Sequence, residues 1–337
     1  MEIRCGELRY EWIEPWIWEE MDPTRERVVG WAHPGMATTA QGEIVTCDPH
    51  AANVLFFSPE GVLRHQFATT LTEAHGIAVT EEDRETFIWI ADPGNKQRLE
   101  DGRLVRHNGV GQVVKFRADG SVALQLEPPD HPVYASGRYA PTAVAVHEER
   151  FGGNGDIWVA DGYGQNHVHR YSHFSRGGSY LDSINGGEGS AGDFRCPHGL
   201  WIDRRGSEPE LYIADRTNRQ VQVYDLDGHY KRSFGQSFLS SPSCFAVDGE
   251  YLIIGELRAR LTVVDRYDQL VGYLGANEAA CERDGWPNTK IGDVLERPKE
   301  LAAGAFNSPH GLTTDAAGNL YIAEWLIGGR TIKLHKL

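Results

Sequence analysis

Short apolar runs that end on an acidic residue recur along the chain. They lie at Val45–Asp48, Trp89–Asp92, Trp158–Asp161, Tyr212–Asp215, Ile253–Glu256 and Tyr321–Glu324. Successive acids are 44, 69, 54, 41 and 68 residues apart. Apolar runs of this length are typical of buried strands, and recurrence at such spacing indicates one repeated supersecondary unit.

Each apolar run has further strand signals on both sides. In one unit a polar turn follows the acid and leads to a strand at Gln220–Tyr224, and the Asp227-Gly228 turn then opens a third strand. Asp-Gly between alternating strands is a strong hairpin signal. Another strand precedes the acid, and in most units proline opens it: Pro34, Pro141, Pro197, Pro242 and Pro309. The pattern predicts an all-β, six-bladed β-propeller of four-stranded antiparallel blades.

The two ends of the chain complete one blade in this interpretation. Residues 35–337 form a single propeller domain whose last unit, at Thr331–Leu337, lacks a fourth strand. The segment 1–34 contains Glu7–Ile13, which has the composition to supply it. Pairing of the two would close the ring and remove an exposed sheet edge.

Composition narrows the functional classes. The 337 residues are 40% hydrophobic and carry a formal net charge of -15, which argues against a nucleic-acid surface. No signal peptide begins the chain, and no apolar run approaches the roughly 18 residues of a membrane span. The five cysteines are odd in number and lack a CxxC pair, which predicts reduced thiols and a cytoplasmic protein.

Histidine and small residues alternate at one position of the repeat. Alignment of the first strands, which line the channel of a propeller, puts six residues at its mouth: Gly35, His75, Thr142, His198, Ser243 and His310. Three imidazoles on alternate blades converge to give a three-nitrogen metal site with an open position, which suits catalytic zinc. A single buried histidine is more often a hydrogen-bonded core residue, but three at matched positions favour the metal. We expect Zn²⁺, with another divalent transition metal as the alternative.

The acids and the residues that follow them have different expected roles. Six equivalent acids indicate a role in the fold, in which each carboxylate accepts backbone N–H groups. Among the residues after them, Tyr163 is a candidate acid or base, and Arg216 is a candidate clamp for a carboxylate. The alternative is that both are solvated turn residues. Arg258 and Trp325 follow the last two acids and are candidate substrate contacts.

Three long insertions are positioned to cover such a site, at Gln97–Gly111, Pro128–Tyr139 and Asn277–Ala305. Tyr134 and Arg138 in the second insertion are candidate substrate-binding residues, together with Tyr139 and Trp286. Aromatic side chains in loops often serve packing alone.

Several of these motifs together resemble a known family. The units look like NHL-type repeats. The three Pro/Ala-His-Gly strands, the Val159–Tyr163 turn and the Ala214–Arg216 turn are similar to those of the peptidyl-α-hydroxyglycine α-amidating lyases. The resemblance implies a six-bladed propeller with zinc held by His75, His198 and His310, and cleavage of a carbinolamide to an amide and glyoxylate. It also implies that Tyr163 is the catalytic tyrosine and Arg216 an active-site arginine.

The chain departs from that family at three places. The first blade reads Cys47–His50 where the lyases have an arginine. Gly311 stands where they have an aspartate associated with a structural calcium, so the resemblance does not extend to calcium. Ser308 replaces a methionine.

A zinc-dependent lyase acting on a small hydroxylated substrate is the favoured hypothesis. A metal-dependent hydrolase such as a six-bladed lactonase and a non-enzymatic NHL-repeat scaffold are the alternatives. Lactonase sites are rich in carboxylates, whereas this site offers histidines, and a pure scaffold has no need of histidines on alternate blades.

Overall fold

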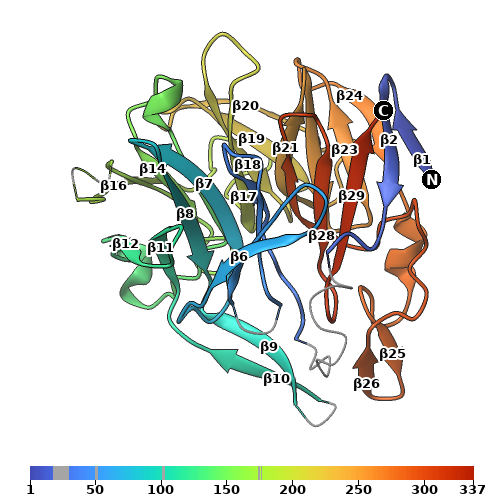
Figure 1. Ribbon diagram of the computed structural model, residues 1–337. Helices are drawn as coiled ribbons and strands as arrows, with labels where there is room; N and C mark the ends of the chain where they lie inside the picture. The colour runs from blue at the N-terminus through green and yellow to red at the C-terminus, as the bar shows by residue number, and fades with distance from the viewer. Residues whose placement is uncertain (18–29, 50–51, 101–102, 174, 176) are drawn as a thin grey trace. The chain divides into compact units, whose positions relative to one another are not determined.

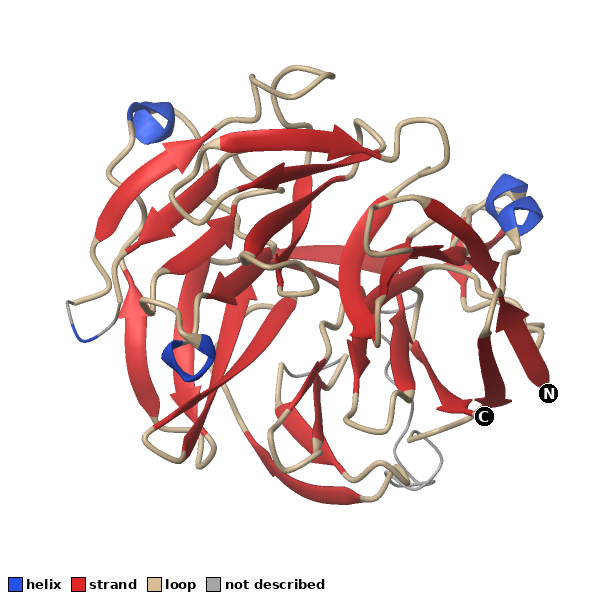
Figure 2. Ribbon diagram, turned by 90° about the horizontal axis from the view of Figure 1, so that it is seen from above, coloured by secondary structure: helices blue, strands red, loops and turns tan. Residues whose placement is uncertain are grey.

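The computed structural model describes residues 1–337 except 18–29, 50–51, 101–102, 174 and 176. His50 of the first-blade motif and part of the segment 1–34 therefore lie outside the described residues. Strands dominate the described chain, which also has three short 3₁₀ helices at Pro132–Ala135, Glu149–Phe151 and Glu278–Glu282 (Figure 2). No helix among the described residues is long and apolar enough to cross a membrane.

The strands form the predicted architecture. Five sheets are four-stranded and antiparallel, and a sixth has the same four-stranded plan with one strand more. The chain is thus an all-β, six-bladed propeller, which confirms the predicted fold class. Contacts between residues divide it into two units, each made of discontinuous stretches of chain.

One unit comprises Leu71–Asn95 and Gly109–Cys244 and contains three sheets. Their strands are β7 (Gly76–Glu82), β8 (Glu85–Asp92), β11 (Gln112–Arg117) and β12 (Val122–Leu126); β13 (Ala143–Val146), β14 (Ile157–Ala160), β15 (Val168–Tyr171) and β16 (Tyr180–Ile184); and β17 (Pro197–Asp203), β18 (Glu210–Asp215), β19 (Gln220–Tyr224) and β20 (Tyr230–Phe234). Within each sheet, consecutive strands of this list are neighbours.

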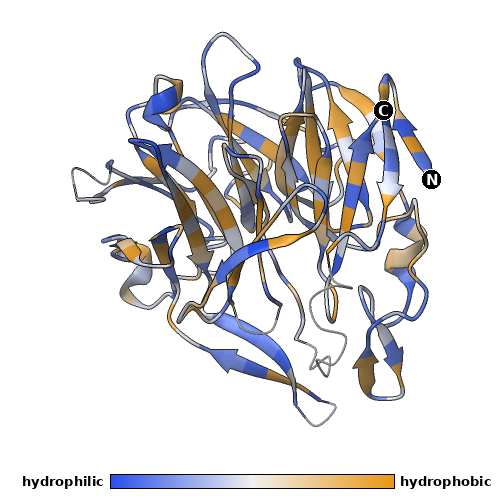
Figure 3. Cartoon of the chain, in the orientation of Figure 1, coloured by the Kyte–Doolittle hydropathy of each residue, from blue (hydrophilic) through white to orange (hydrophobic). Residues whose placement is uncertain are grey.

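The other unit comprises Met1–Thr70, Lys96–Asn108 and Phe245–Leu337. Its sheets contain β3 (Ala37–Thr38), β4 (Ile44–Cys47), β5 (Val54–Phe57) and β6 (Leu63–Phe67); β21 (Pro242–Asp248), β22 (Tyr251–Glu256), β23 (Arg260–Val264) and β24 (Leu270–Leu274); and β27 (Pro309–Thr314), β28 (Leu320–Glu324), β29 (Arg330–Lys336), β2 (Leu8–Ile13) and β1 (Glu2–Cys5). Two hairpins coincide with predicted insertions. The hairpin of β9 (Asn95–Glu100) and β10 (Arg103–Asn108) begins two residues before the insertion predicted at Gln97–Gly111, and that of β25 (Thr289–Ile291) and β26 (Val294–Glu296) lies inside Asn277–Ala305. The β9–β10 hairpin is hydrophilic over most of its length (Figure 3).

The middle strands of the sheets carry the core. Four of the middle strands are buried at every residue, namely β14, β19, β23 and β28, and β18 is buried from Leu211 to Asp215. Outer strands such as β6 and β20 are mostly exposed or half-buried. A strand with neighbours on both sides and packed faces cannot present polar groups to water, so it is apolar almost throughout. This burial explains why the apolar runs are the clearest repeat in the sequence.

The N-terminal segment pairs with the last strand of the chain. In β2, Tyr10 lies opposite Lys336 and Ile13 opposite Lys333, which places the strand at the open edge of β29 (Figure 1). The predicted closing strand is therefore present. A further strand that we did not predict, β1, folds back on β2 as a hairpin. The boundary at residue 34 and the assignment of 35–337 as a single domain stay predictions.

Candidate metal centre and neighbouring side chains

Each of the three predicted histidines lies at the start of the first strand of its blade, His75 directly before β7 and the other two at the second residue of β17 and β27, and all three are buried. His75, His198 and His310 are 2%, 2% and 3% exposed. A Cβ atom on the glycine that follows each one would lie only 2.3–2.4 Å from a backbone carbonyl oxygen of a neighbouring first strand. A side chain there would collide with backbone, so glycine is required for the close approach. The His-Gly pair is thus a packing requirement as much as a chemical one.

The three imidazole rings are oriented in the same way. Nδ1 of His75 lies 2.8 Å from the Thr142 carbonyl oxygen, and Nδ1 of His198 lies 3.0 Å from that of Ser243. A carbonyl oxygen only accepts, so each Nδ1 carries the hydrogen and donates it. In the neutral ring the lone pair is then on Nε2, which is the arrangement of a metal-bound histidine with an outer hydrogen-bond partner.

His310 makes the equivalent contact to Pro34, with Nδ1 3.3 Å from the carbonyl oxygen. Our alignment had put Gly35 at the position of Thr142 and Ser243, and this was wrong by one residue. In the third and fifth blades the proline precedes that position, whereas in the first blade the proline occupies it. The first strand there, β3, has only two residues, so it gave too little pattern to fix the register.

The three histidines can hold a metal ion. One ring nitrogen from each lies within 4.8 Å of the others. The donor set fits a transition metal, because neutral imidazole suits zinc and its neighbours, whereas calcium prefers oxygen ligands. Three protein nitrogens leave a coordination position for substrate or water, as in catalytic zinc sites.

Tyr163 contacts two of these histidines, and Arg216 contacts Tyr163. The Tyr163 hydroxyl is 3.3 Å from Nε2 of His75 and 3.2 Å from Nε2 of His198. The Arg216 Nη1 is 3.5 Å from the same hydroxyl, and its guanidinium carbon lies 5.4 Å from the centre of the Tyr163 ring. Burial raises the pKa of Tyr163, although the charge of Arg216 opposes the rise. The phenol therefore holds its proton at neutral pH.

A short loop between β14 and β15 places Tyr163. A Cβ on Gly162 would lie 2.3 Å from the Pro197 carbonyl oxygen, so glycine lets the loop touch the strand that carries His198. Farther along the loop, the Asn166 side chain accepts a hydrogen bond of 2.9 Å from the backbone N–H of Cys196. The loop with Tyr163 and the start of β17 are therefore held together.

The repeated acids hold the segments that lead into the first strands. Asp92 accepts hydrogen bonds from the backbone N–H groups of Thr72 and Glu73, at 2.8 and 3.1 Å, just before His75. Burial raises the pKa of Asp92, and these donors oppose the rise. Equivalent bonds reach Asp161 from Ala140, Asp215 from Arg195, and Glu324 from Asn307 and Ser308. The predicted fold role is confirmed for these four acids, but most of the donors precede the first strand, not only the turn after the second.

The predicted substrate-binding residues have varied surroundings. The Tyr134 hydroxyl bonds Asp161 at 2.6 Å and His169 at 2.7 Å. Arg138 donates to the carbonyl oxygens of residues 93 and 94. Arg258 is half-buried and pairs with Glu282 at 2.7 Å. The structure thus brings Tyr163 and Arg216 to His75 and His198 and shows internal partners for these other three. The assigned catalytic and substrate-binding roles stay predictions.

Trp325 belongs to an aromatic group that includes a neighbour of His310. Its ring stacks on Trp31 with centroids 5.1 Å apart, and His33 lies 5.5 Å from both Trp325 and His310. Trp286 of the last insertion meets Trp325 edge to face at 5.9 Å. We did not predict His33. Its position directly before Pro34, at the entry to a first strand, was the signal available.

Cys196 is a second residue that we did not predict. It immediately precedes Pro197 and His198, and the charge of Arg216 acts on its thiol. Burial raises the pKa of the thiol. Burial alone would lower the pKa of Arg216, but Tyr163 and Cys196 raise it above its ordinary value. The guanidinium is therefore a permanent cation beside the Tyr163 hydroxyl.

The fold and the three histidines define the class of protein, a six-bladed β-propeller with a buried three-histidine group able to hold a metal ion. No protein-family model matches the chain. NHL repeat-containing protein 3 of Homo sapiens is 26% identical over 221 residues, which are 63% of this chain and 57% of that protein. Peptidyl-alpha-hydroxyglycine alpha-amidating lyase 1 of Drosophila melanogaster is 28% identical over 271 residues, 74% of this chain and 42% of that protein.

Solved structures show the same fold. A streptogramin B lyase superposes with a TM-score of 0.54 at 11% identity, over 97% of this chain and 98% of that one. Virginiamycin B lyase from Staphylococcus aureus gives 0.53 at 11% identity, over 97% and 100%. The chain is thus similar to NHL-repeat proteins and to an amidating lyase, which confirms the resemblance seen in the sequence. It spans less than 60% of the length of these sequence relatives.

Proposed function

We propose that this protein is a zinc-dependent lyase that cleaves a C–N or C–O bond at a hydroxylated carbon of a small, carbinolamide-like substrate. The observation that carries the proposal is the Tyr163 hydroxyl, 3.2–3.3 Å from Nε2 of both His75 and His198 and in reach of Arg216. A proton donor and a fixed cation thus adjoin the metal ligands. The similarity to an amidating lyase supports this proposal.

In this mechanism Arg216 binds the substrate carboxylate, because a guanidinium pairs with both carboxylate oxygens at once. Zinc, held by His75, His198 and His310, would act as a Lewis acid on a substrate oxygen. Tyr163, protonated because burial raises its pKa, donates its proton to the leaving nitrogen as the C–N bond breaks. The proton of the substrate hydroxyl returns to the phenolate while the new C=O bond forms. The products are an amide and glyoxylate, and Tyr163 ends as it began.

Substrate contacts by Trp325, Tyr134, Arg138 and Arg258 belong to the same proposal. Trp325 has the strongest support, because His33 links its ring to that of His310. We further propose that the partner is a small molecule and not nucleic acid or membrane, and that the protein works in the cytoplasm. The five free cysteines are compatible with that compartment.

Metal analysis of the purified protein tests whether the three histidines bind a transition metal. We expect about one transition-metal ion per wild-type chain and a loss of at least tenfold in affinity for His198→Ala. His229→Ala is the matched control, because His229 is exposed and pairs only with Asp225 among the contacts seen for its ring. Wild-type protein that binds no metal when zinc is supplied would refute the proposal.

Parallel assays of an N-acyl-α-hydroxyglycine and a simple lactone test the proposed reaction. We expect glyoxylate release that falls by 10²-fold or more in Tyr163→Phe, since a general acid contributes about 10²–10⁴-fold. Tyr230→Phe is the control, because its hydroxyl bonds Ser233 at 2.9 Å on an outer strand. Lactone hydrolysis without glyoxylate release would instead identify the metal-dependent hydrolase. A metal-loaded protein with neither activity would favour the scaffold.

A further inference from the structure

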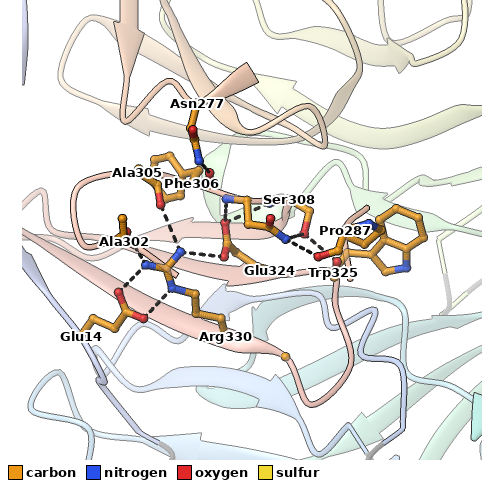
Figure 4. Close-up of polar contacts among 12 residues, drawn as sticks. Glu14, Asn277, Pro287, Ala302, Ala305, Phe306, Ser308, Glu324, Trp325 and Arg330 are labelled. Atoms are coloured by element: carbon orange, nitrogen blue, oxygen red, sulfur yellow. Dashed lines mark hydrogen bonds and ion pairs between the residues drawn. The ribbon is translucent and has the colours of Figure 1, made fainter. Parts of the chain in front are cut away.

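The last blade contains a buried arginine with charged partners on both sides. Arg330 is 2% exposed in its side chain, and its Nε and Nη2 lie 2.5 Å from the two carboxylate oxygens of Glu14. Its Nη1 lies 3.2 Å from Glu324. The guanidinium also donates to the carbonyl oxygens of Ala302 and Ala305, at 2.9 and 3.1 Å (Figure 4). All five donors of the planar fork are directed at acceptors.

Glu324 uses its other oxygen to hold the approach to His310. That oxygen accepts hydrogen bonds from the backbone N–H groups of Asn307, at 2.5 Å, and Ser308, at 3.0 Å. Pro309, which follows, has no N–H group, and His310 comes next. The Ser308 hydroxyl donates to the carbonyl oxygen of Trp325 at 2.6 Å, which fixes the same segment from its side chain (Figure 4).

The charge on Glu324 depends on Arg330. The carboxylate is fully buried, and burial raises its pKa, whereas Arg330 and the two N–H donors favour the charged form. Without the cation, a buried carboxylate either protonates or rearranges, because an unpaired charge in the interior is strongly unfavourable. Either outcome weakens the bonds to residues 307 and 308.

Glu14 sets the position of Arg330 from a distant part of the sequence. It lies just after β2, and it holds the guanidinium in a two-oxygen pair that leaves only Nη1 for Glu324. Removal of Glu14 frees the fork of Arg330 to pair with both oxygens of Glu324. One of those oxygens is the acceptor that Asn307 and Ser308 need.

We infer that Glu14 and Arg330 are positioning residues for His310, which they control through Glu324 and the segment 307–308. Glu14 thereby supports the metal centre through Arg330 and Glu324, in addition to the direct contact of Pro34 with His310. This inference rests on the proposed function only in that His310 is a metal ligand. It makes no assumption about the substrate or the reaction.

Zinc affinity, measured by competition with a chromophoric chelator, tests the inference. We expect Glu14→Gln and Arg330→Lys to raise the zinc Kd about tenfold or more, as loss of an outer partner typically does. Tyr10→Phe is the matched control. The Tyr10 hydroxyl donates to Asp248 at 2.6 Å, so this variant also loses a buried hydrogen bond of β2 but none of the contacts to Glu324.

Two further measurements separate positioning from general weakening. Urea unfolding of Tyr10→Phe and Glu14→Gln compares their stabilities, and amide hydrogen exchange should rise at residues 307 and 308 in Glu14→Gln alone. Normal zinc affinity in both Glu14→Gln and Arg330→Lys would overturn the inference and leave the metal centre intact. An equal rise in zinc Kd for Tyr10→Phe would overturn it too. Wild-type protein without zinc affinity would refute the proposed function and this inference together.

Discussion

The fourth and sixth blades hold their histidines by the same device but stabilise it differently. In each, a buried acid at the end of the second strand accepts backbone N–H groups from the segment before the histidine. Asp215 is surrounded by neutral amides, whereas Glu324 faces a buried guanidinium. The amide donors to Asp215 are Asn218 at 2.8 Å, Gln220 at 2.9 Å and Gln222 at 3.3 Å.

The difference shows two ways of keeping a carboxylate ionised in the interior. The neutral side chains that donate to Asp215 all lie within seven residues of it in the sequence. Glu324 has a local cation, but that cation is fixed by Glu14, which is 316 positions away from Arg330 in the sequence. The side-chain donors of Asp215 therefore come from its own blade, whereas the surroundings of Glu324 depend on both ends of the chain.

The largest expected effect comes from removing the cation of the sixth blade. Arg330→Met leaves Glu324 buried without its charge partner and should lower the free energy of unfolding by about 3–5 kcal/mol. Denaturant unfolding of the purified variant measures this. The double variant Arg330→Met with Glu324→Gln removes both charges and should recover part of the loss. If the free energy of unfolding of Arg330→Met lies within about 1 kcal/mol of wild type, Glu324 does not depend on its cation and the contrast between the two blades is wrong.

The glycine after each histidine should behave alike in the two blades. Gly199→Ala and Gly311→Ala each put a Cβ 2.3–2.4 Å from a carbonyl oxygen, so one strand must move. We expect a loss of about 3 kcal/mol in each and weaker zinc binding, because overpacking at backbone is costly. Thermal unfolding and zinc titration check both. Gly206→Ala is the control for the substitution itself, since Gly206, like Gly199 and Gly311, has no positive φ, and its Cβ would lie 3.5 Å from the Glu208 carbonyl oxygen, an ordinary contact. A large loss of stability in only one of the two variants would show that the His-Gly pair does not have the same packing role in the two blades.

The third blade contains a buried histidine ring whose charge depends on pH. His169 bonds Tyr134 through Nε2 and Ser183 through Nδ1, and burial lowers its pKa from 6.5 to about 3. Above pH 6.5 the ring is neutral in both the folded and unfolded states, so it makes no difference to stability. Between pH 6.5 and about 3, His169 takes up a proton only in the unfolded state, so the free energy of unfolding falls as the pH is lowered through this range.

At pH 5 this one group should cost about 2 kcal/mol relative to pH 7. Urea unfolding at the two pH values measures the change. In His169→Gln the fall should be smaller by that amount, whereas His229→Gln, at an exposed histidine, should not reduce it. An unchanged pH dependence in His169→Gln would show that this ring does not contribute.

The smallest expected effect tests the fourth blade. Gln220→Ala removes one of three amide donors to Asp215 and should cost about 1 kcal/mol, since the other two remain. Zinc affinity should change less than threefold. Denaturant unfolding and chelator competition on the same sample give both values. A zinc Kd for Gln220→Ala as high as that of Arg330→Lys would mean that loss of one neutral donor to Asp215 disturbs the metal centre as much as a change in the Glu14–Arg330–Glu324 group.

Features that recur in several blades could be predicted from the sequence, whereas features that occur once in the chain could not. The acids and the His-Gly steps stand at equivalent places in several blades, so alignment of the repeats was sufficient to find them. Pro34 was misplaced by one residue because β3 is too short to show its register. Glu14 belongs to no repeat. Arg330 lies opposite the acid of its blade, as Arg260 does in the fifth blade, but its pairing with Glu14 follows only from the folded chain. The β1 strand, which has no counterpart in the other blades, was missed for the same reason.

The backbone carbonyls that accept from the three Nδ1 atoms have a consequence for how the proposed site would take up a metal ion. Each ring is fixed at two points, at its Cβ and at Nδ1, so it cannot flip and its Nε2 lone pair keeps its direction. Stripping the ion with a chelator should then leave the imidazoles in place, with little conformational entropy to lose on reloading. The apoprotein would be a preformed receptor that takes up zinc in a single fast phase.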